Sequence, residues 1–251
     1  MKRERRRMKC VLISCFLLLG LVSPSWSGKT VDHSLYGELL GKYVKDGVVD
    51  YQGFKKEEGK LDQYLNLLDQ RNPDELPRNE QLAFYINAYN AYTIKLILKN
   101  YPVDSIKDIG GWFTGPWKIR FCKIGGKTLT LDEIEHEVIR PRFKDPRVHF
   151  AVNCASKGCP PLISEPYQAS ILDQQLDANT LSFLNNPERN RLEGNTLYVS
   201  KIFKWFGEDF GGDVVGFLLQ YADGDLKNRL VAGRDRIKID YLHYDWSLNG
   251  K

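Results

Sequence analysis

The sequence predicts a single α+β domain that is mostly helical and carries a small antiparallel sheet. Apolar residues recur at helical spacing in several segments, and short alternating or β-branched runs lie between them. The two kinds of segment do not follow one another as regular β-α-β units, which argues against a parallel doubly wound sheet. Because no repeat or linker-like stretch follows Gly28, we expect one domain over residues 28–251.

The first 27 residues have the layout of a secretory signal peptide. Six basic residues precede or flank the start of the apolar run Val11–Val22, and the small-x-small sequence Ser25-Trp26-Ser27 comes just before Gly28. The apolar run is shorter than the roughly 20 residues that a membrane-spanning helix needs. We therefore expect a periplasmic or secreted protein with no stable membrane span after signal removal; an uncleaved anchor is the alternative.

The charge balance depends on that segment. Of the 36 basic and 32 acidic residues, six basic and one acidic lie in residues 1–27, which leaves 30 and 31. The remaining 224 residues are close to neutral, so we expect no nucleic-acid partner. A chain of this length can also bury a sizeable hydrophobic core, so the fold does not need disulfides for its stability.

The N-terminal part predicts two helices and a short extended piece. The first helix covers residues 35–44, and the extended piece covers 48–51 after a turn at Asp46-Gly47. The second helix is indicated by leucines at helical spacing: Leu61, Leu65 and Leu68.

The strongest helical pattern covers residues 80–99, with Asn79 as the predicted N-cap and Pro102 beyond its end. Apolar residues occur on several of its sides, so we expect this helix to lie in the core. Asn87 and Asn90 lie three residues apart on one face, and buried asparagines need hydrogen-bond partners. They either satisfy the backbone of a neighbouring loop or face a substrate.

A β-hairpin is predicted next. Trp117, Ile119 and Phe121 alternate with polar positions that include Cys122, and Gly125-Gly126 then turns the chain. Trp112, Phe113 and Trp117 either anchor a loop on the core or line a groove for a carbohydrate or peptide.

A capped helix follows the hairpin. Thr130 and Glu133 fit a capping box, and the helix is expected to end at Arg140 because Pro141 follows. His136 lies on its polar face, where it either interacts with the helix dipole or contributes to a site. Further helices are expected at 168–185 and 214–222, and strands near Leu197–Val199 and Ile237–Ile239. Residues 201–210 are expected to be mainly core, with Glu208 and Asp209 at the surface.

The segment Val148–Leu162, VHFAVNCASKGCPPL, places a histidine, an asparagine and two cysteines within eleven residues. We interpret its start as a strand with His149 and Asn153 on one face and apolar residues on the other. A loop then presents Cys159 immediately before two prolines. The segment is the candidate site of the chain.

Three kinds of site fit these residues. Cys159 is a candidate thiol nucleophile with His149 as its base and an asparagine as polar support. In an oxidising compartment, Cys154 and Cys159 instead form a local disulfide. The third alternative is a zinc site built from His136, His149 and the two cysteines. Together with Cys122 the count is odd after signal removal, so at least one thiol is free or paired with another chain.

The chain resembles the domain-of-unknown-function 547 family in five segments that occur in the family's order. They are FYINAYNAYTIKLIL, LTLDEIEHEVIR, VHFAVNCASKGCPPL, SKIFKWFGEDF and YDWSLN, from about Leu82 to Asn249. The resemblance singles out as motif positions Asn87, Asn90, His136, His149 and Cys159, without giving them roles. Many relatives have serine where this chain has Gly158.

These observations together predict an exported thiol-dependent hydrolase or transferase. It would act on amide or ester bonds of an envelope or extracellular substrate, in a papain-like or transglutaminase-like manner. Its predicted catalytic set is Cys159, His149, His136, Asn87 and Asn90, and we expect no cofactor. The alternatives are a non-catalytic binding module stapled by Cys154–Cys159 and a zinc-binding protein with histidine and cysteine ligands.

Overall fold

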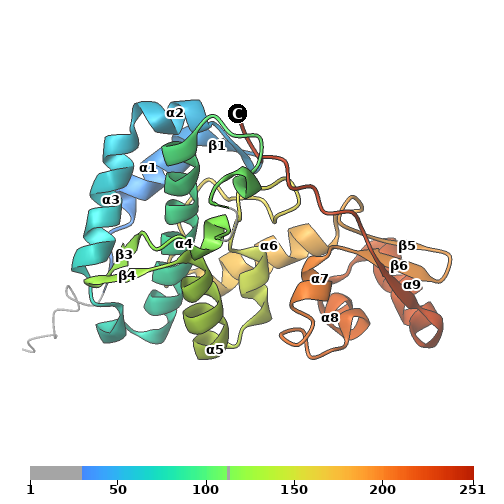
Figure 1. The fold of residues 1–251 in the computed structure, drawn as a ribbon. Helices are drawn as coiled ribbons and strands as arrows, with labels where there is room; N and C mark the ends of the chain where they lie inside the picture. The colour runs from blue at the N-terminus through green and yellow to red at the C-terminus, as the bar shows by residue number, and fades with distance from the viewer. Residues whose placement is uncertain (1–29, 112–113) are drawn as a thin grey trace, which may run out of the picture.

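The protein is described by a computed structural model over residues 30–111 and 114–251 (Figure 1). The predicted signal peptide, Trp112 and Phe113 lie outside the described residues. The fold is α+β, as predicted, with helices, small sheets and two apolar clusters. Among the described residues, no helix is long and apolar enough to cross a membrane.

The first cluster is built on the N-terminal helices. Helices α1 (Ser34–Tyr43), α3 (Glu58–Gln70) and α4 (Arg78–Asn100) pack together, with α2 (Tyr51–Lys56) above them in Figure 1. The predicted helices at 35–44 and 61–68 are confirmed. The chain turns between α1 and α2 through the hairpin of β1 (Val44–Lys45) and β2 (Val48–Val49). Tyr51, expected to be extended, begins α2 because the Asp50 carboxylate caps it by accepting from Gly53 N at 2.8 Å.

Helix α4 is the central element of this cluster, since every residue from Leu82 to Leu98 is buried. It begins at Arg78, two residues earlier than predicted, and Asn79 is therefore not its N-cap. Pro77 occupies the capping position, and its carbonyl accepts the first backbone bond, from Gln81 N. Proline suits this position because its missing N–H would be unpaired there.

The predicted hairpin forms, but its strands are shorter: β3 (Cys122–Ile124) and β4 (Lys127–Leu129). Trp117 lies instead in the short helix η4 (Pro116–Lys118). Cys122 was expected on the polar side and is fully buried, while Lys123 is exposed. The turn glycines donate to the Leu68 and Asp69 carbonyls at the end of α3, and this docking turns the Cys122 side of the strand inward.

The helix after the hairpin starts with the predicted capping box. Thr130 N donates to Glu133 Oε2 at 2.8 Å, and Glu133 N donates to Thr130 Oγ1 at 3.0 Å. The helix does not end at Arg140. It runs as a π-helix, η5 (Glu133–Ile139), and continues as α5 (Arg140–Phe143), because Pro141 is tolerated in the first turn of the new α-helical segment.

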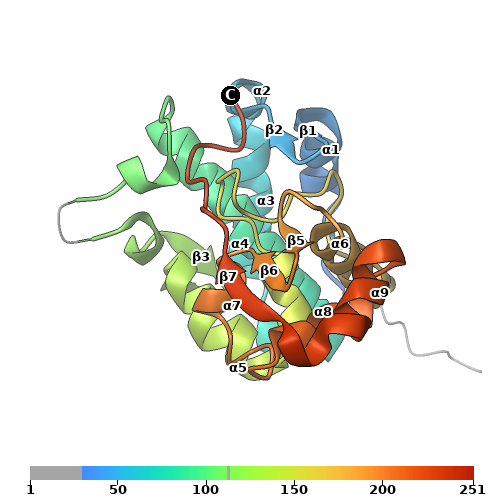
Figure 2. The ribbon, with the colours of Figure 1, turned by 90° about the vertical axis from the view of Figure 1, so that its right-hand side faces the viewer.

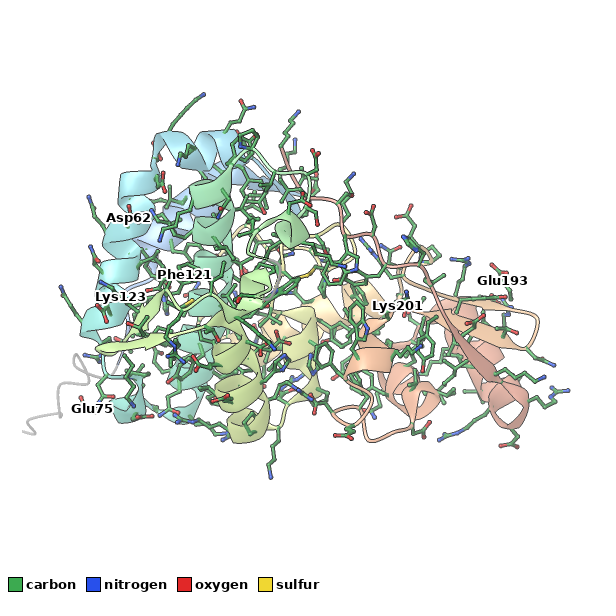
Figure 3. All side chains as sticks on the ribbon, viewed as in Figure 1. Asp62, Glu75, Phe121, Lys123, Glu193 and Lys201 are labelled. Carbon is green, nitrogen blue, oxygen red and sulfur yellow. A yellow bond between two sulfur atoms is a disulfide. The ribbon has the colours of Figure 1, made fainter. Side chains whose placement is uncertain are left out.

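The second cluster is built mainly from residues 183–244, which face the viewer in Figure 2. Its helices are the C-terminal end of α6 (Leu172–Leu184), α7 (Ile202–Trp205), α8 (Val214–Tyr221) and α9 (Gly224–Gly233). Its sheet has the order β5-β6-β7, from β5 (Asn190–Glu193), β6 (Thr196–Val199) and β7 (Lys238–Tyr241). The sheet was expected to be antiparallel, but β6 and β7 pair in parallel because α7, α8 and α9 intervene between them. In Figure 3, Glu193 and Lys201 mark this half, and Asp62 and Phe121 mark the other.

The predicted strand at Val148–Val152 is wrong: residues 146–150 form the 3-10 helix η6 (Pro146–Phe150). Asp145 caps this turn by accepting from Arg147 N at 3.0 Å, and Pro146 occupies the first helical position. Helical geometry buries Val148, His149 and Phe150 together, with Val148 in the first cluster and Phe150 in the second. The segment therefore joins the two clusters.

Two asparagines of α4 hold the segment that follows. Asn90 Nδ2 donates to the Ala151 carbonyl at 3.0 Å, and Asn90 Oδ1 accepts from Asn153 N at 2.8 Å. Asn87 makes the same pair of bonds to the carbonyl and N–H of Tyr167, both at 2.8 Å. Each side-chain amide thus gives the backbone of a buried loop the hydrogen-bond partners that a neighbouring strand would otherwise supply. This is the first of the two roles expected from the sequence, in which the asparagines satisfy the backbone of a loop.

The Asn90→Ala variant should lose much of its stability, since it leaves the buried Ala151 carbonyl and Asn153 N–H without their partner. We expect a cost of roughly 1–3 kcal/mol for each orphaned group, measured by urea denaturation. Asn79→Ala is the matched control, because Asn79 is exposed in the first turn of the same helix. Equal stability of the two variants would contradict the loop-holding role.

Candidate functional site

A cavity of about 230 Å³ opens where the two apolar clusters meet. Its walls come from α4, η4, η5, η6, the cysteine loop, α7 and the C-terminal segment, so sequence-distant parts of the chain form it together. Its lining includes aromatic, acidic, imidazole and sulfur groups: Tyr89, Trp117, Asp132, Glu135, His136, His149, Cys154, Cys159, Trp205, Phe206, Tyr244 and Trp246.

The aromatic side chains form a continuous wall. Tyr244 lies 4.6 Å from Trp246 and 4.7 Å from Trp205, measured between ring centroids. Trp117 meets the edge of Trp246 at 5.6 Å. Trp205 remains 43% exposed although its ring is held by two neighbours. A partly exposed tryptophan whose ring is held by two neighbouring aromatic rings presents a rigid apolar face to a ligand.

Glu135 supplies a buried acid to this cavity. Burial raises the pKa of its carboxyl, an effect that the nearby His136 and the hydrogen bond with Tyr89 only partly oppose. The carboxyl is therefore biased toward its neutral form, in which it can both donate and accept a hydrogen bond.

His149 is held rigidly and without charge. Its ring stacks on Phe206 at 4.1 Å, and its side chain is only 1% exposed. Burial lowers its pKa to about 4, although the nearby Asp209 opposes the shift. Because the ring is neutral and Nε2 lies 2.6 Å from Asp209 Oδ2, Nε2 carries the proton and Nδ1 the lone pair.

Asp209 is the orienting carboxylate of this histidine and was expected at the surface. Partial burial by itself raises the pKa of Asp209, but hydrogen bonds from Arg140 and His149 outweigh it and hold the pKa below its usual range. Arg140 grips both carboxylate oxygens, at 2.6 and 3.2 Å, and lies over the Phe206 ring. An ionised carboxylate, a neutral imidazole and a guanidinium thus form one hydrogen-bonded chain, of which the imidazole lines the cavity.

Cys154 and Cys159 are joined by a disulfide, with an S–S distance of 2.05 Å. The disulfide alternative is therefore the one that the structure contains. A nucleophilic role for Cys159 requires the bond to be reduced first, since the nucleophile is a thiolate. Both sulfurs contact the hydroxyl groups of Ser156 and Tyr244 at 3.2–3.5 Å.

The zinc alternative finds no support in this geometry. His136, His149 and the two cysteines do line one cavity, but the sulfurs are bonded to each other. His136 faces Asp132 at 3.5 Å and Arg140 at 3.1 Å. Within the described part of the chain, no three histidine, cysteine or acidic side chains are placed to hold a metal ion.

The structure brings together His136, His149 and Cys159 from the predicted set, whereas Asn87 and Asn90 bind loop backbone outside the cavity lining. Sequence reasoning missed Glu135, Asp209 and Tyr244. For Glu135 a signal was present, because it lies four residues after Leu131 and three before Val138, on the apolar side of the helix. Asp209 and Tyr244 reach the site only through tertiary packing.

Gly158 explains how Tyr244 reaches the disulfide. A Cβ at Gly158 would lie 2.8 Å from three atoms of the Tyr244 ring, closer than a side chain tolerates. The bare backbone lets the ring lie flat against the cysteine loop. Gly158 N also donates to the Asp245 carbonyl at 2.8 Å, which fixes the C-terminal segment that carries Tyr244.

The buried neutral His149 should make the protein less stable in mild acid. Between its unfolded pKa near 6.5 and its folded pKa of about 4, only the unfolded state binds the proton, so stability falls as pH decreases. We expect this residue to account for about 2 kcal/mol of the loss between pH 7 and pH 5. Urea denaturation of His149→Gln at both pH values should show a correspondingly smaller loss than the wild type.

Buried His33, whose pKa burial also lowers to about 4, remains in both proteins and cancels in that comparison. His243→Gln serves as the control because His243 is exposed, and its pH dependence should match the wild type. An unchanged loss in His149→Gln would refute the assignment.

No curated protein and no solved structure matches this chain. The predicted papain-like or transglutaminase-like architecture therefore has no support from comparison. Residues 73–184 match the family described as "Protein of unknown function, DUF547". The matched range contains Glu135, His149, both bonded cysteines and the two loop-holding asparagines. Residues 73–184 therefore belong to the domain-of-unknown-function 547 family.

Proposed function

We propose that this protein is an exported binding module that holds one neutral sugar ring of a larger glycan in the aromatic cavity. The observation that carries the proposal is the pairing of a rigid, partly exposed aromatic wall with a neutral imidazole and a buried carboxyl whose pKa is raised. From the sequence, a non-catalytic binding module with a Cys154–Cys159 disulfide is an alternative to the enzyme. The proposal adopts that alternative and names neutral sugars as the class of ligand.

The wall suits a sugar because the C–H faces of a pyranose ring are apolar while its edge is polar. Trp205 offers a flat face at the opening, with Tyr244 and Trp246 packed behind it. Large aromatic groups provide contact area at low cost in side-chain entropy, and here their neighbours have already fixed them.

The polar groups favour a ligand without charge. The Glu135 carboxyl, whose pKa burial raises, offers hydrogen-bonding oxygens to a ligand hydroxyl, and the lone pair of a neutral His149 accepts from one. Neither group offers a positive charge to an anionic ligand, and the acidic Asp132 also lines the cavity. Hydroxyl groups of a neutral sugar match this mixture of donors and acceptors.

The size of the cavity limits the bound part to a single ring. Ligand pockets usually enclose about 300–1,000 Å³, and this one encloses about 230 Å³. A longer saccharide would therefore place one unit inside and the rest across Trp205. The predicted signal peptide supports an encounter with envelope or extracellular glycans.

The test is isothermal titration with N,N′-diacetylchitobiose and cellobiose as neutral probes, with a uronic-acid disaccharide and indole as comparisons. We expect a neutral disaccharide to bind and Trp205→Ala to weaken it at least tenfold, as expected for loss of a stacking aromatic. Leu181→Ala is the matched control, since Leu181 is similarly exposed and lies on α6 away from the cavity. Binding only of indole or the acid, or an unaltered Trp205→Ala, would sink the proposal.

A second candidate is the thiol-dependent hydrolase or transferase predicted from the sequence. Its support is that Cys159 and an Asp209-oriented His149 line the same cavity, which assembles the group types of a thiol triad. This activity requires the reduced protein, so it is a property of a different redox state.

The reduced protein should then hydrolyse an activated ester such as p-nitrophenyl acetate faster than the oxidised protein, because only reduction yields a thiolate. Cys159→Ala should abolish that increase, measured by release of p-nitrophenol. Cys122→Ser should retain it, because Cys122 is buried and does not line the cavity. If reduced Cys159→Ala keeps the wild-type rate, the thiol enzyme is excluded.

A further inference from the structure

We infer that the Cys154–Cys159 disulfide is a thiol-exchange site at which a small thiol attacks Cys154 and Cys159 leaves as a stabilised thiolate. This is an activity separate from ligand binding, and it requires only that the bond be reachable and that one sulfur be the better leaving group. The contacts around the two sulfurs provide both conditions.

The two sulfurs differ in access. Cys154 is half-buried, whereas Cys159 is only 5% exposed. Both line the aromatic cavity, and Cys159 also lines a second hollow beside Lys157 and Pro161. The attacking sulfur must approach along the S–S axis from the side of the sulfur it bonds, so the more open Cys154 is the target.

The hydrogen bonds favour Cys159 as the sulfur that leaves. Its Sγ lies 2.9 Å from the N–H of Cys154, 3.2 Å from the Tyr244 hydroxyl and 3.5 Å from the Ser156 hydroxyl. Cys154 Sγ faces the same two hydroxyls, each at 3.3 Å. Of the two sulfurs, only Cys159 Sγ accepts a hydrogen bond from a backbone N–H among these contacts. A backbone N–H has a fixed direction, whereas a hydroxyl proton can rotate away.

The hydroxyls are arranged to reinforce that difference. Ser156 Oγ donates to Tyr244 Oη at 3.3 Å, and Tyr244 Oη donates to Cys159 Sγ. Each hydroxyl has one proton, so this relay directs both toward Cys159. Burial raises the pKa of Tyr244 to about 12, which keeps its proton available for donation. Hydrogen bonds to a thiolate lower its pKa, and a lower pKa makes the sulfur a faster leaving group.

The exchange balances in two steps. A thiolate RS⁻ bonds to Cys154 Sγ, the S–S bond breaks, and its electron pair leaves on Cys159 Sγ. A second RS⁻ bonds to the sulfur of R in the mixed disulfide, which releases RSSR and the Cys154 thiolate. Two electrons pass from two molecules of a small thiol, such as glutathione, to the protein, and solvent returns the protons. In reverse, the Cys159 thiolate attacks a mixed disulfide held on Cys154.

Cys122 provides an internal reference for this chemistry. Its thiol is fully buried in the first cluster, and burial raises its pKa far above the ordinary range. A thiol in that state is a poor nucleophile at neutral pH. Reaction of the folded protein with a thiol should therefore be confined to the cavity pair.

The experiment incubates the oxidised full-length protein with reduced glutathione at pH 7.5, followed by acid quenching and peptide mass spectrometry. We expect glutathione on Cys154, with Cys159 and Cys122 unmodified by glutathione. Tyr244→Phe and Ser156→Ala should slow the reduction at least threefold each, because each weakens the relay to Cys159. Tyr241→Phe is the matched control, since it removes a hydroxyl from a nearby tyrosine with no contact to the sulfurs, and it should react at the wild-type rate.

A second measurement separates leaving-group stabilisation from a change in structure. In Cys154→Ser, the pH dependence of iodoacetamide alkylation gives the pKa of the Cys159 thiol, which should lie below the ordinary value of about 8.5 and rise in the Cys154→Ser, Tyr244→Phe double variant. Glutathione found on Cys159, no reduction of the folded protein, or a Cys159 pKa at or above the ordinary value would overturn the inference. Saccharide titration of the oxidised protein is independent of these results, so the two proposals fail separately.

Discussion

A chain of buried amide groups ties the cysteine loop and the C-terminal segment to the N-terminal helices. Asn90 of α4 binds the backbone of Asn153, whose own side chain accepts from Ala155 N and Asn249 Nδ2 and donates to the Pro160 carbonyl. Asn249 Oδ1 in turn accepts from the Tyr51 hydroxyl at 2.7 Å. The network joins the central helix, the disulfide loop, the C-terminal segment and the start of α2. Buried polar groups of this kind are costly unless all are paired, and here each supports the next.

The amide chain also determines where the cavity lies. It holds the cysteine loop against α4, and the C-terminal segment is fixed beside that loop by Lys157 N and Gly158 N donating to the Ser247 and Asp245 carbonyls. Figure 1 shows this segment running back from β7 to the top of the N-terminal half. Tyr244 and Trp246 are carried along it and complete the aromatic wall. The disulfide closes the loop over a separation of only five residues, so it shapes the wall locally and does not join the halves.

The cavity combines a neutral imidazole with a buried carboxyl whose pKa is raised. For Glu135 and for His149 the dominant cause is burial, which disfavours the charged form of either group. The one firm charge pair, Arg140 with Asp209, lies behind the imidazole and fixes its proton on Nε2. A binding role would use the neutral imidazole and the buried carboxyl directly. A thiol role would use the cysteine loop, where hydroxyls and a backbone N–H converge on Cys159.

The sequence by itself determined the family, the α+β class, the helices around Leu61 and Ile86, the capping box at Thr130 and the segment that holds the site. These features follow from periodicity and local hydrogen bonding, which act over a few residues. It did not determine that residues 146–150 form a 3-10 turn, because Asp145 and Pro146 outweigh an alternating pattern that equally suits a strand. The side on which Cys122 lies was also decided by docking on α3, not by the strand's own alternation.

The composition of the site was decided by tertiary structure. Asp209 and Tyr244 lie 60 and 95 residues from His149, and nothing in their local sequence distinguishes them from surface or core residues. Only packing of the second cluster turns Asp209 toward the imidazole, and only the bare backbone of Gly158 admits the Tyr244 ring. The choice among thiol, zinc and disulfide likewise needed three-dimensional distances. Spacing brings two cysteines near each other along the chain, but bonding depends on where their side chains point.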